Sequence, residues 1–438
     1  MAISGRSFSD IDWWILAPAI FLMGAGVLFI YSSGVTSEGL VVSNEWIKQL
    51  VWVASGLVLL VAVIVVDWKR WRDWAPWFYG AALVALVYTK LFGRVVNGAR
   101  SWIGVGDVGV QPSEFTKIAA ILMLAKYLAD SRHDPNRFGR FLKAFAIAAI
   151  PMAFILIQPD FGTSLVFLPI FLVMAWIGGI ETRYVAFVGL LAVLTLGFAV
   201  LPLYETVIAD APSVWLSVFY EPPRSWLLIG GLAGVFALAT LGFLLGRKRY
   251  YYWIAYSSLL LGASLLVALV GRMVLKEYQV MRLIVFLDPS VDPRGSGWNI
   301  LQSITAIGSG GFGGRGFLQG TQSHYRYLPQ QSTDFIFSIL SEEWGLMGGV
   351  LVFSLFFILL ARSVLLLRNL KSAFASYVVA GVVGMVFFHF IINVGMAMGI
   401  MPITGIPLFF LSYGGSSLWT ALVGIGLTLA VSARRFDL

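Results

Sequence analysis

The chain has 438 residues, of which 59% are hydrophobic and 12% are charged, and its formal net charge is +8. Soluble domains carry about 25% charged residues, so this composition excludes an ordinary soluble enzyme and indicates a protein folded in a bilayer. The chain contains no cysteine, which excludes disulfides, a thiol nucleophile and a zinc–cysteine site.

Apolar runs of membrane-spanning length recur along the whole chain. They predict an all-α polytopic membrane protein with twelve spans, at 13–32, 47–66, 75–92, 114–129, 142–157, 162–179, 184–201, 226–246, 250–271, 335–361, 375–399 and 413–431. The first run has no small-residue cleavage site and is long enough to span, so we do not interpret it as a removable signal. Residues 1–438 are predicted to form one integral membrane domain.

The cations gather in alternate connections, which orients the chain across the membrane. With the N-terminus inside, the inner segments carry Arg6, Lys69, Arg70, Arg72, Lys126, Arg132, Arg137, Arg140, Lys143, Arg183, Arg247, Lys248, Arg249, Arg362, Arg368, Lys371, Arg434 and Arg435. The positive-inside rule then places both termini in the cytoplasm. It also explains the basic balance, so no nucleic-acid partner is expected.

The predicted outer connections are longer than the inner ones, at 93–113, 202–225 and especially 272–334. Long loops without periodicity are functional or disordered, and the aromatics and glycines of 272–334 favour an ordered structure. A further outer turn, MPITGIPLFFLSYGGSS at 401–417, interrupts apolar sequence with prolines and glycines. Irregular backbone at that depth must be buried in protein or line a wet cavity. The outer face is therefore the predicted working face.

The motif QPSEFTK at 111–117 predicts a helix start, with Ser113 as N-cap and Glu114 in the first turn. Lys117 follows Glu114 by three residues, so both lie on one helix face. One interpretation is an ion pair that fixes helix packing. The other is an anion site, in which the helix N-terminus, Lys117 and Arg100 bind a phosphate group. A second outer motif, QPDFG at 158–162, also places a proline and a carboxylate, Asp160, at a membrane boundary.

Asp334 lies in LPQQSTDFIF, at the mouth of a long apolar run. If a helix begins at Thr333 or Asp334, the carboxylate caps it or lies in its first turn. Alternatively, Asp334 is a general base that accepts a proton from a hydroxyl nucleophile. Glu342 and Glu343 would lie about 12 Å deeper, too far for a catalytic pair with Asp334, and are expected to bond polar groups of neighbouring helices.

Other polar patterns are weaker signals. GSGGFG at 308–313 matches a dinucleotide-binding pattern, but no strand precedes it. Asp288 and Asp292 are more typical of a turn than of a cation site. The three histidines make no metal-ligand cluster, and His389 with Asn393 predicts interhelical hydrogen bonds.

Seven motifs resemble those of the bacterial SEDS family, the membrane glycosyltransferases represented by RodA and FtsW. They occur in the family's order over nearly the whole chain: NGARSWI (97–103), QPSEFTK (111–117), QPDFGTS (158–164), FLDPSVDPRGSGWNILQS (286–303), AIGSGGFGGRGF (306–317), LPQQSTDFIFSILSEEWG (328–345) and GIPLFFLSYGGSS (405–417). The sequence GTQSHYRYLPQQSTDFIF is more similar to the elongation branch, represented by RodA, than to the division branch.

The resemblance implies polymerisation of lipid II into glycan strands outside the cytoplasmic membrane, with inversion at the donor's anomeric carbon. Asp334 matches the family's essential aspartate and would deprotonate the acceptor sugar's 4-hydroxyl. Arg100, Glu114 and Lys117 match positions tied to substrate binding, and the two cations would stabilise the departing pyrophosphate. Supporting roles are expected for Gln111, Asp160 and Asp292.

The resemblance also implies a bacterial inner-membrane location, membrane-lipid contacts, a class B penicillin-binding protein and other elongation-complex partners. A divalent cation, Mg or Mn, is expected to assist, with no ligands assigned. Two other functions stay open: a lipid II flippase or transporter, and a non-catalytic scaffold of a cell-wall synthesis complex. The chain departs from the family's usual ten spans by an extra pair at 226–271, whose basic turn keeps the loop 272–334 outside.

Overall fold

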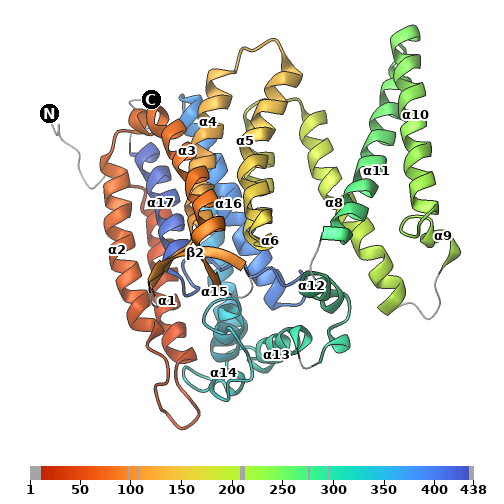
Figure 1. The fold of residues 1–438 in the computed structure, drawn as a ribbon. Helices are drawn as coiled ribbons and strands as arrows, with labels where there is room; N and C mark the ends of the chain where they lie inside the picture. Colours follow the sequence, from red (N-terminus) through yellow and green to blue (C-terminus); the bar gives the residue numbers. More distant parts are fainter. Residues whose placement is uncertain are drawn as a thin grey trace. The chain divides into compact units, whose positions relative to one another are not determined.

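The computed structural model describes residues 11–96, 99–105, 108–207, 213–274, 277–293 and 295–433. Figure 1 shows that helices dominate them. The longer elements are α1 Trp13–Ser33, α2 Glu45–Val65, α3 Trp68–Phe92, α4 Pro112–Asp130, α5 Arg137–Ile157, α7 Phe167–Ile177, α8 Thr182–Val207, α10 Arg224–Gly246, α11 Arg249–Val274, α12 Glu277–Leu287, α13 Ser296–Ser309, α15 Ile336–Leu367, α16 Ala373–Ala397 and α17 Gly415–Ser432. The shorter ones are β1 Arg94–Val96, β2 Ala99–Val105, β3 Val108–Val110, α6 Phe161–Leu165, α9 Val214–Ser217, η2 Pro289–Val291 and α14 Thr321–His324. The predicted helical, polytopic architecture is confirmed.

Within the described ranges, ten helices are long and apolar enough to cross a membrane. The other two predicted spans differ for identifiable reasons. Helix α4 carries Glu114, Lys117 and Lys126, which lower its hydropathy. Residues 162–179, predicted as one helix, break at Val166 into α6 and α7. The total of twelve spans therefore stays a prediction.

The chain divides into two compact units, one of Met1–Ile180 with Gln302–Leu438 and one of Glu181–Leu301. The second unit contains the pair predicted as additional, which forms α10 and α11. Helix α11 packs against both α8 and α10 (Figure 1). Only 6% of the 18-residue apolar stretch of α10 is buried within protein, as expected for a lipid-facing helix. The prediction of a single domain is not tested by this division.

Helices α16 and α17 form the centre of the first unit. The 18-residue apolar stretches of these two helices are 72% and 83% buried, more than those of the other candidate spans. Helix α16 contacts α4, α7, α15 and α17, and α17 also contacts α2 and α4. A polar side chain on the inward face of α16 is therefore enclosed by protein, where it needs a polar partner.

The segment 401–414 has no regular secondary structure, as predicted, and is buried in protein. Leu408, Phe409, Phe410 and Leu411 are each at most 1% exposed. Gly26 of α1 lies against this segment, and a Cβ there would come within 2.7 Å of the carbonyl oxygens of Phe410 and Leu411. Surrounding helices thus shield this irregular backbone from lipid.

A small antiparallel sheet precedes α4 and was not predicted. Its strand order is β1-β2-β3, with Val95 opposite Arg100 and Ile103 opposite Val110. Strand β2 contacts α3 and α4. Strands this short, with several glycines, leave too few residues for a period-two pattern to be detected. Asn97 and Gly98 of the motif NGARSWI lie outside the described residues.

The predicted outer loop 272–334 carries helices of its own, α12, η2, α13 and α14. Residues 275, 276 and 294 of this loop lie outside the described part of the chain, as do Arg6, Arg434 and Arg435 near the termini. The loop's outer location and the cytoplasmic termini stay predictions.

Candidate active site

Helix α4 begins at Pro112, with Gln111 as its N-cap residue, so the prediction of Ser113 as N-cap is wrong. Proline favours the first helical position because its fixed φ suits the helix and its missing N–H would be unpaired there anyway. Ser113 is thereby moved into the first turn, where Glu114 also lies, as predicted. The main-chain N–H of Gln111 donates to Ser416 Oγ at 3.0 Å. This bond ties the helix start to the start of α17.

Lys117 and Glu114 form a buried ion pair on one face of α4. The distance from Lys117 Nζ to Glu114 Oε1 is 2.8 Å, and the Lys117 side chain is fully buried. The expected (i, i+3) neighbourhood is therefore confirmed. Because the ammonium is enclosed and already neutralised, it meets a phosphate only if this pair opens.

A third group completes the buried cluster. His389 of α16 places Nε2 3.0 Å from Lys117 Nζ and Nδ1 2.9 Å from the carbonyl oxygen of Pro407. The imidazole stacks on Phe409, with ring centroids 3.7 Å apart. The interhelical hydrogen bond predicted for His389 is confirmed, and it joins α4 to α16 and to the irregular segment.

The two Gln-Pro motifs meet in space. Gln111 Nε2 donates to Asp160 Oδ2 at 2.8 Å, and Asp160 Oδ1 accepts from the N–H of Thr163 at 3.1 Å. Asp160 is thus the N-cap of α6 and also a partner of the residue that begins α4. Two predicted supporting residues are brought together at one end of the bundle.

Asp334 lies in a turn before α15, whose N-cap is Phe335, so Asp334 neither caps this helix nor lies in its first turn. The turn is fastened through its backbone. Asn393 Nδ2 donates to the carbonyl oxygen of Asp334 at 2.9 Å, and Ser412 Oγ donates to that of Thr333 at 2.6 Å. Asp334 itself is partly buried. These bonds fix the main chain of the turn that carries Asp334.

His389 and Asn393 lie one turn apart on the same face of α16, so the Lys117 cluster and the Asp334 turn are held by one helix face. The two anchoring side chains are separated by about 6 Å along the helix axis. Asn393 Oδ1 and Thr404 Oγ1 are buried and have no hydrogen-bond partner among the described residues. Such orphaned atoms indicate positions for ordered water.

Arg100 is exposed on β2, where its Nη1 donates to the carbonyl oxygen of Leu91 at 3.1 Å. Among the described contacts, no hydrogen bond or ion pair joins Arg100 to Glu114 or Lys117. Arg100 therefore lies in the sheet that leads into α4, while the Lys117 cluster is inside the bundle. The expected joint cation site is not assembled in this structure.

Asp292 belongs to the second unit and follows η2. Its carbonyl oxygen accepts from the N–H of Gly297 at 3.1 Å, and Asp288 Oδ1 accepts from the N–H of Ser290 at 2.8 Å. The bonds from Ser290 lower the pKa of Asp288 below its ordinary value. These contacts match the predicted turn role of the FLDPSVDP motif.

Glu342 and Glu343 are fully buried and bond the segment 318–324, rather than Asp334. Glu342 accepts from the N–H of Gln322 at 2.8 Å and from Thr321 Oγ1 at 3.1 Å. Glu343 accepts from Ser32 Oγ of α1 and from the N–H of Leu318. They are structural carboxylates, as predicted, although most of their donors come from the loop.

His324 lies 3.6 Å from Glu343 Oε1 through Nε2 and 2.7 Å from the carbonyl oxygen of Val35 through Nδ1. Glu343 raises the pKa of His324, burial opposes this effect, and the bond to Val35 adds to it. The segment before Asp334 is therefore attached to α15 and to the residue Val35, which follows α1, by a titratable group.

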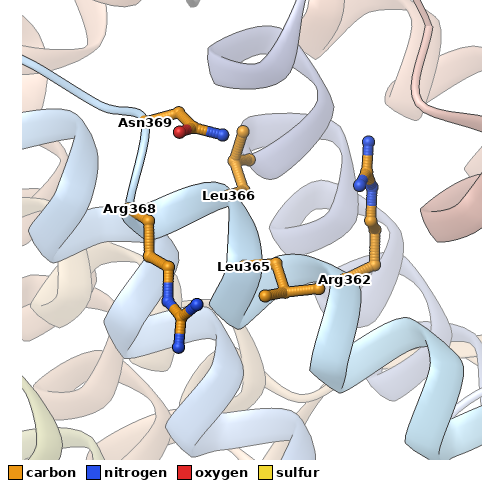
Figure 2. A pocket seen from close by; sticks show the side chains of 5 residues that line it. All are labelled: Arg362, Leu365, Leu366, Arg368 and Asn369. Carbon is orange, nitrogen blue, oxygen red and sulfur yellow. The ribbon is translucent and has the colours of Figure 1, made fainter.

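A cavity of about 240 Å³ lies at the far end of α15 and is lined by Arg362, Leu365, Leu366, Arg368 and Asn369. Figure 2 shows the guanidinium groups of Arg362 and Arg368 pointing in different directions. Arg362 Nε already donates to Asp12 Oδ2 at 2.8 Å. Since Asp334 precedes the first residue of α15, whereas the lining residues lie in and just beyond its last two turns, the cavity is separate from the candidate site.

The site combines a partly buried carboxylate with a buried lysine–glutamate–histidine cluster, in a bundle of apolar helices. This arrangement defines a multi-pass membrane protein with intramembrane polar groups, a class in which such groups mark function. The family model for FtsW, RodA and SpoVE, described as cell cycle protein, matches residues 13–223 and 230–436. The chain therefore belongs to this family, and the predicted resemblance is confirmed.

The relatives match over nearly their whole length. The peptidoglycan glycosyltransferase RodA of Treponema pallidum is 50% identical, over 98% of this chain and 99% of its own. Stage V sporulation protein E of Bacillus subtilis is 31% identical over 96% of each chain. Among solved structures, a chain of a peptidoglycan synthase complex that coordinates polymerization and crosslinking has a TM-score of 0.67 and 26% identity, covering 98% of this chain and 99% of that one.

The family match also bears on the pair of helices predicted as additional. Its second range begins at residue 230 and so includes most of α10 and all of α11. The Treponema relative is matched over 99% of its length. The family model therefore includes most of this helix pair together with the rest of the chain.

Proposed function

We propose that this protein is a peptidoglycan glycosyltransferase that polymerises lipid II into glycan strands for cell elongation. Family membership and the half-identical relative that carries this activity in its name support the proposal. The single structural observation that carries it is the Asp334 turn. A partly buried carboxylate precedes a helix in a multi-pass membrane protein, and its backbone is fastened by Asn393 and Ser412.

In the proposed reaction, Asp334 accepts the proton of the acceptor sugar's 4-hydroxyl. The hydroxyl oxygen forms a bond to the anomeric carbon of the donor, and the bond from that carbon to the pyrophosphate oxygen breaks. The configuration at the carbon inverts, and undecaprenyl pyrophosphate leaves with the electron pair of the broken bond. A fixed base is effective because proton transfer needs hydrogen-bond distance to the attacking hydroxyl.

The two cations expected to bind the pyrophosphate differ in burial. Lys117 is buried and neutralised by Glu114, whereas Arg100 is exposed on β2. We therefore assign the pyrophosphate contact to Arg100 and to the N-terminal end of α4, where the positive end of the helix dipole favours an anion. Lys117 acts by holding the interior of the site together.

The described residues offer no ready-made cluster of protein ligands for the expected divalent cation. Among them, no group of three or more His, Asp or Glu side chains could hold a metal ion. Glu114 and Asp160 are already bonded to Lys117 and Gln111. A cation that arrives with the pyrophosphate of the substrate is still proposed, but no step of this mechanism depends on it.

We also propose that the protein works with a class B penicillin-binding protein and other elongation proteins in the bacterial inner membrane. Support comes from its similarity to a chain of a complex that coordinates polymerization and crosslinking. The active site would face outward and both termini inward, in accordance with the distribution of cations.

The deciding experiment uses the purified protein with a class B penicillin-binding protein and labelled lipid II. Glycan strands on a gel, absent with Asp334→Ala, are the expected result. Equal product from wild type and Asp334→Ala contradicts the general-base role. If neither makes polymer but lipid II crosses the membrane of vesicles containing the protein, a transporter is indicated. If the protein neither polymerises nor transports lipid II, and Asp334→Ala leaves its function in cell-wall synthesis intact, a scaffold is indicated.

A further inference from the structure

The protonation state of His389 follows from its two partners. The carbonyl oxygen of Pro407, 2.9 Å from Nδ1, can only accept, so Nδ1 carries the proton. The ammonium of Lys117, 3.0 Å from Nε2, can only donate, so Nε2 presents its lone pair. His389 is therefore a neutral imidazole of defined tautomer. A second proton on its ring would point at the ammonium.

The imidazole is also fixed in orientation. It is 1% exposed and stacks on Phe409, with an angle of 17° between the ring planes. Phe409 lies in the buried irregular segment, and Pro407 in the same segment supplies the carbonyl. His389 thus links this segment to Lys117, which in turn bonds Glu114 at the start of α4.

Asn393 performs the corresponding task one turn further along α16. Its amide nitrogen donates to the carbonyl oxygens of Asp334 at 2.9 Å and of Ile406 at 2.8 Å. Both of its N–H groups are used, so an amide is required here and a carboxylate of the same shape would not serve. Asn393 therefore holds the Asp334 turn against the face of α16, and the irregular segment, that also hold His389.

We propose that His389 and Asn393 are positioning residues for glycosyl transfer, which set the Asp334 base and the Glu114–Lys117 pair at a fixed separation along α16. The inference rests on the proposed function, since it assigns a task to residues that support that reaction. Neither residue touches substrate in this scheme. Their contribution is geometric, because a small misplacement of a catalytic group from the reacting atoms is costly.

The first test does not depend on activity. In protein labelled with ¹⁵N at histidine, the His389 signal is assigned by its loss in His389→Gln. We expect a protonated Nδ1, an unprotonated Nε2, and a change in the Nε2 chemical shift in Lys117→Met. A proton on Nε2, or a spectrum that Lys117→Met leaves unchanged, overturns the arrangement. This result stands even if the protein makes no polymer, so it separates the inference from the proposed function.

The second test is kinetic and uses lipid II with the wild-type complex as reference. His389→Phe and Asn393→Asp should lower kcat by about 100-fold while KM for lipid II stays nearly constant. His389→Gln, which retains an acceptor and a donor, should recover most of the activity. Thr428→Val is the matched control, because among the described contacts this buried hydroxyl of α17 bonds only to Gly424 of its own helix.

The controls exclude a role in folding alone. Each variant is compared with wild type by gel filtration and by its unfolding temperature in detergent. If His389→Phe does not fold, the Gln variant and the histidine spectrum still decide. Wild-type kcat in Asn393→Asp, or a His389→Gln variant as slow as His389→Phe, overturns the proposal.

Discussion

Gln111 donates a hydrogen bond from its side-chain amide to Asp160, 2.8 Å away, and so joins the two Gln-Pro motifs of the chain. The bond connects the residue before α4 with the residue that caps α6. Because both helices begin at this point, the amide–carboxylate contact joins their first turns. That contact can be tested by exchanging the two partners.

We expect the first substitution to lower the stability of the protein and the second to restore it. Gln111→Glu places two carboxylates together and should lower the free energy of unfolding by about 1 to 3 kcal/mol. Adding Asp160→Asn restores a donor–acceptor pair and still provides an oxygen for the N–H of Thr163. The unfolding temperature in detergent should therefore rise again in the double variant. A double variant no more stable than Gln111→Glu contradicts the pairing.

The Glu114–Lys117 pair predicts strong coupling between two substitutions. Lys117→Met leaves a buried carboxylate without its cation and should destabilise the protein by about 3 to 5 kcal/mol. Glu114→Leu combined with Lys117→Met removes both charges, so the double variant should be more stable than Lys117→Met alone. Thermal unfolding of the two single variants and the double variant measures the coupling. Additive losses would show that the two side chains do not depend on each other.

Asp334→Asn is expected to abolish chain growth while leaving the fold intact. The amide cannot accept the hydroxyl proton, so the rate of polymerisation should fall by at least about 100-fold. The backbone bond from Asn393 is unaffected, so the unfolding temperature should change little. Lipid II polymerisation on gels, with Asp73→Asn at an exposed position as control, measures the effect. Loss of activity with equal loss of stability would indicate a structural role.

His324 predicts that stability depends on pH. Glu343 raises the pKa of His324 above its ordinary value of 6.5, so the folded protein binds the proton more tightly than the unfolded chain. The corresponding stabilisation is fully present below pH 6.5 and is lost as pH rises through the raised pKa. Unfolding temperatures across that range should fall with rising pH in wild type more steeply than in His324→Gln. Identical pH profiles would exclude His324 as the titrating group.

Arg100 and Lys117 are expected to differ in kinetics as they differ in exposure. Arg100→Ala removes an exposed cation and should weaken the use of lipid II with little loss of stability. The exposed Arg94, which precedes it in the same sheet, provides a comparison of equal charge. The value of kcat/KM for lipid II is the relevant measurement. Unchanged kcat/KM in Arg100→Ala would remove the pyrophosphate assignment.

Some features of the site could be predicted because they are local in sequence. The spacing of Glu114 and Lys117 places them on one helix face whatever the rest of the chain does. The prolines and glycines of 401–417 similarly exclude a continuous helix there. Ser113 and Asp334 show the limit of such reasoning, because the caps of α4 and α15 are Gln111 and Phe335, two residues before Ser113 and one after Asp334.

The sequence by itself determined the membrane class, the helical spans and the motifs that carry the family resemblance, since apolar run length and charge are properties of neighbouring residues. Only the tertiary structure decided which polar groups meet. Lys117 and His389 are 272 residues apart and Asp334 and Asn393 are 59 apart, and no local pattern encodes those pairs. They are selected because helix packing encloses polar atoms that must then find partners within protein.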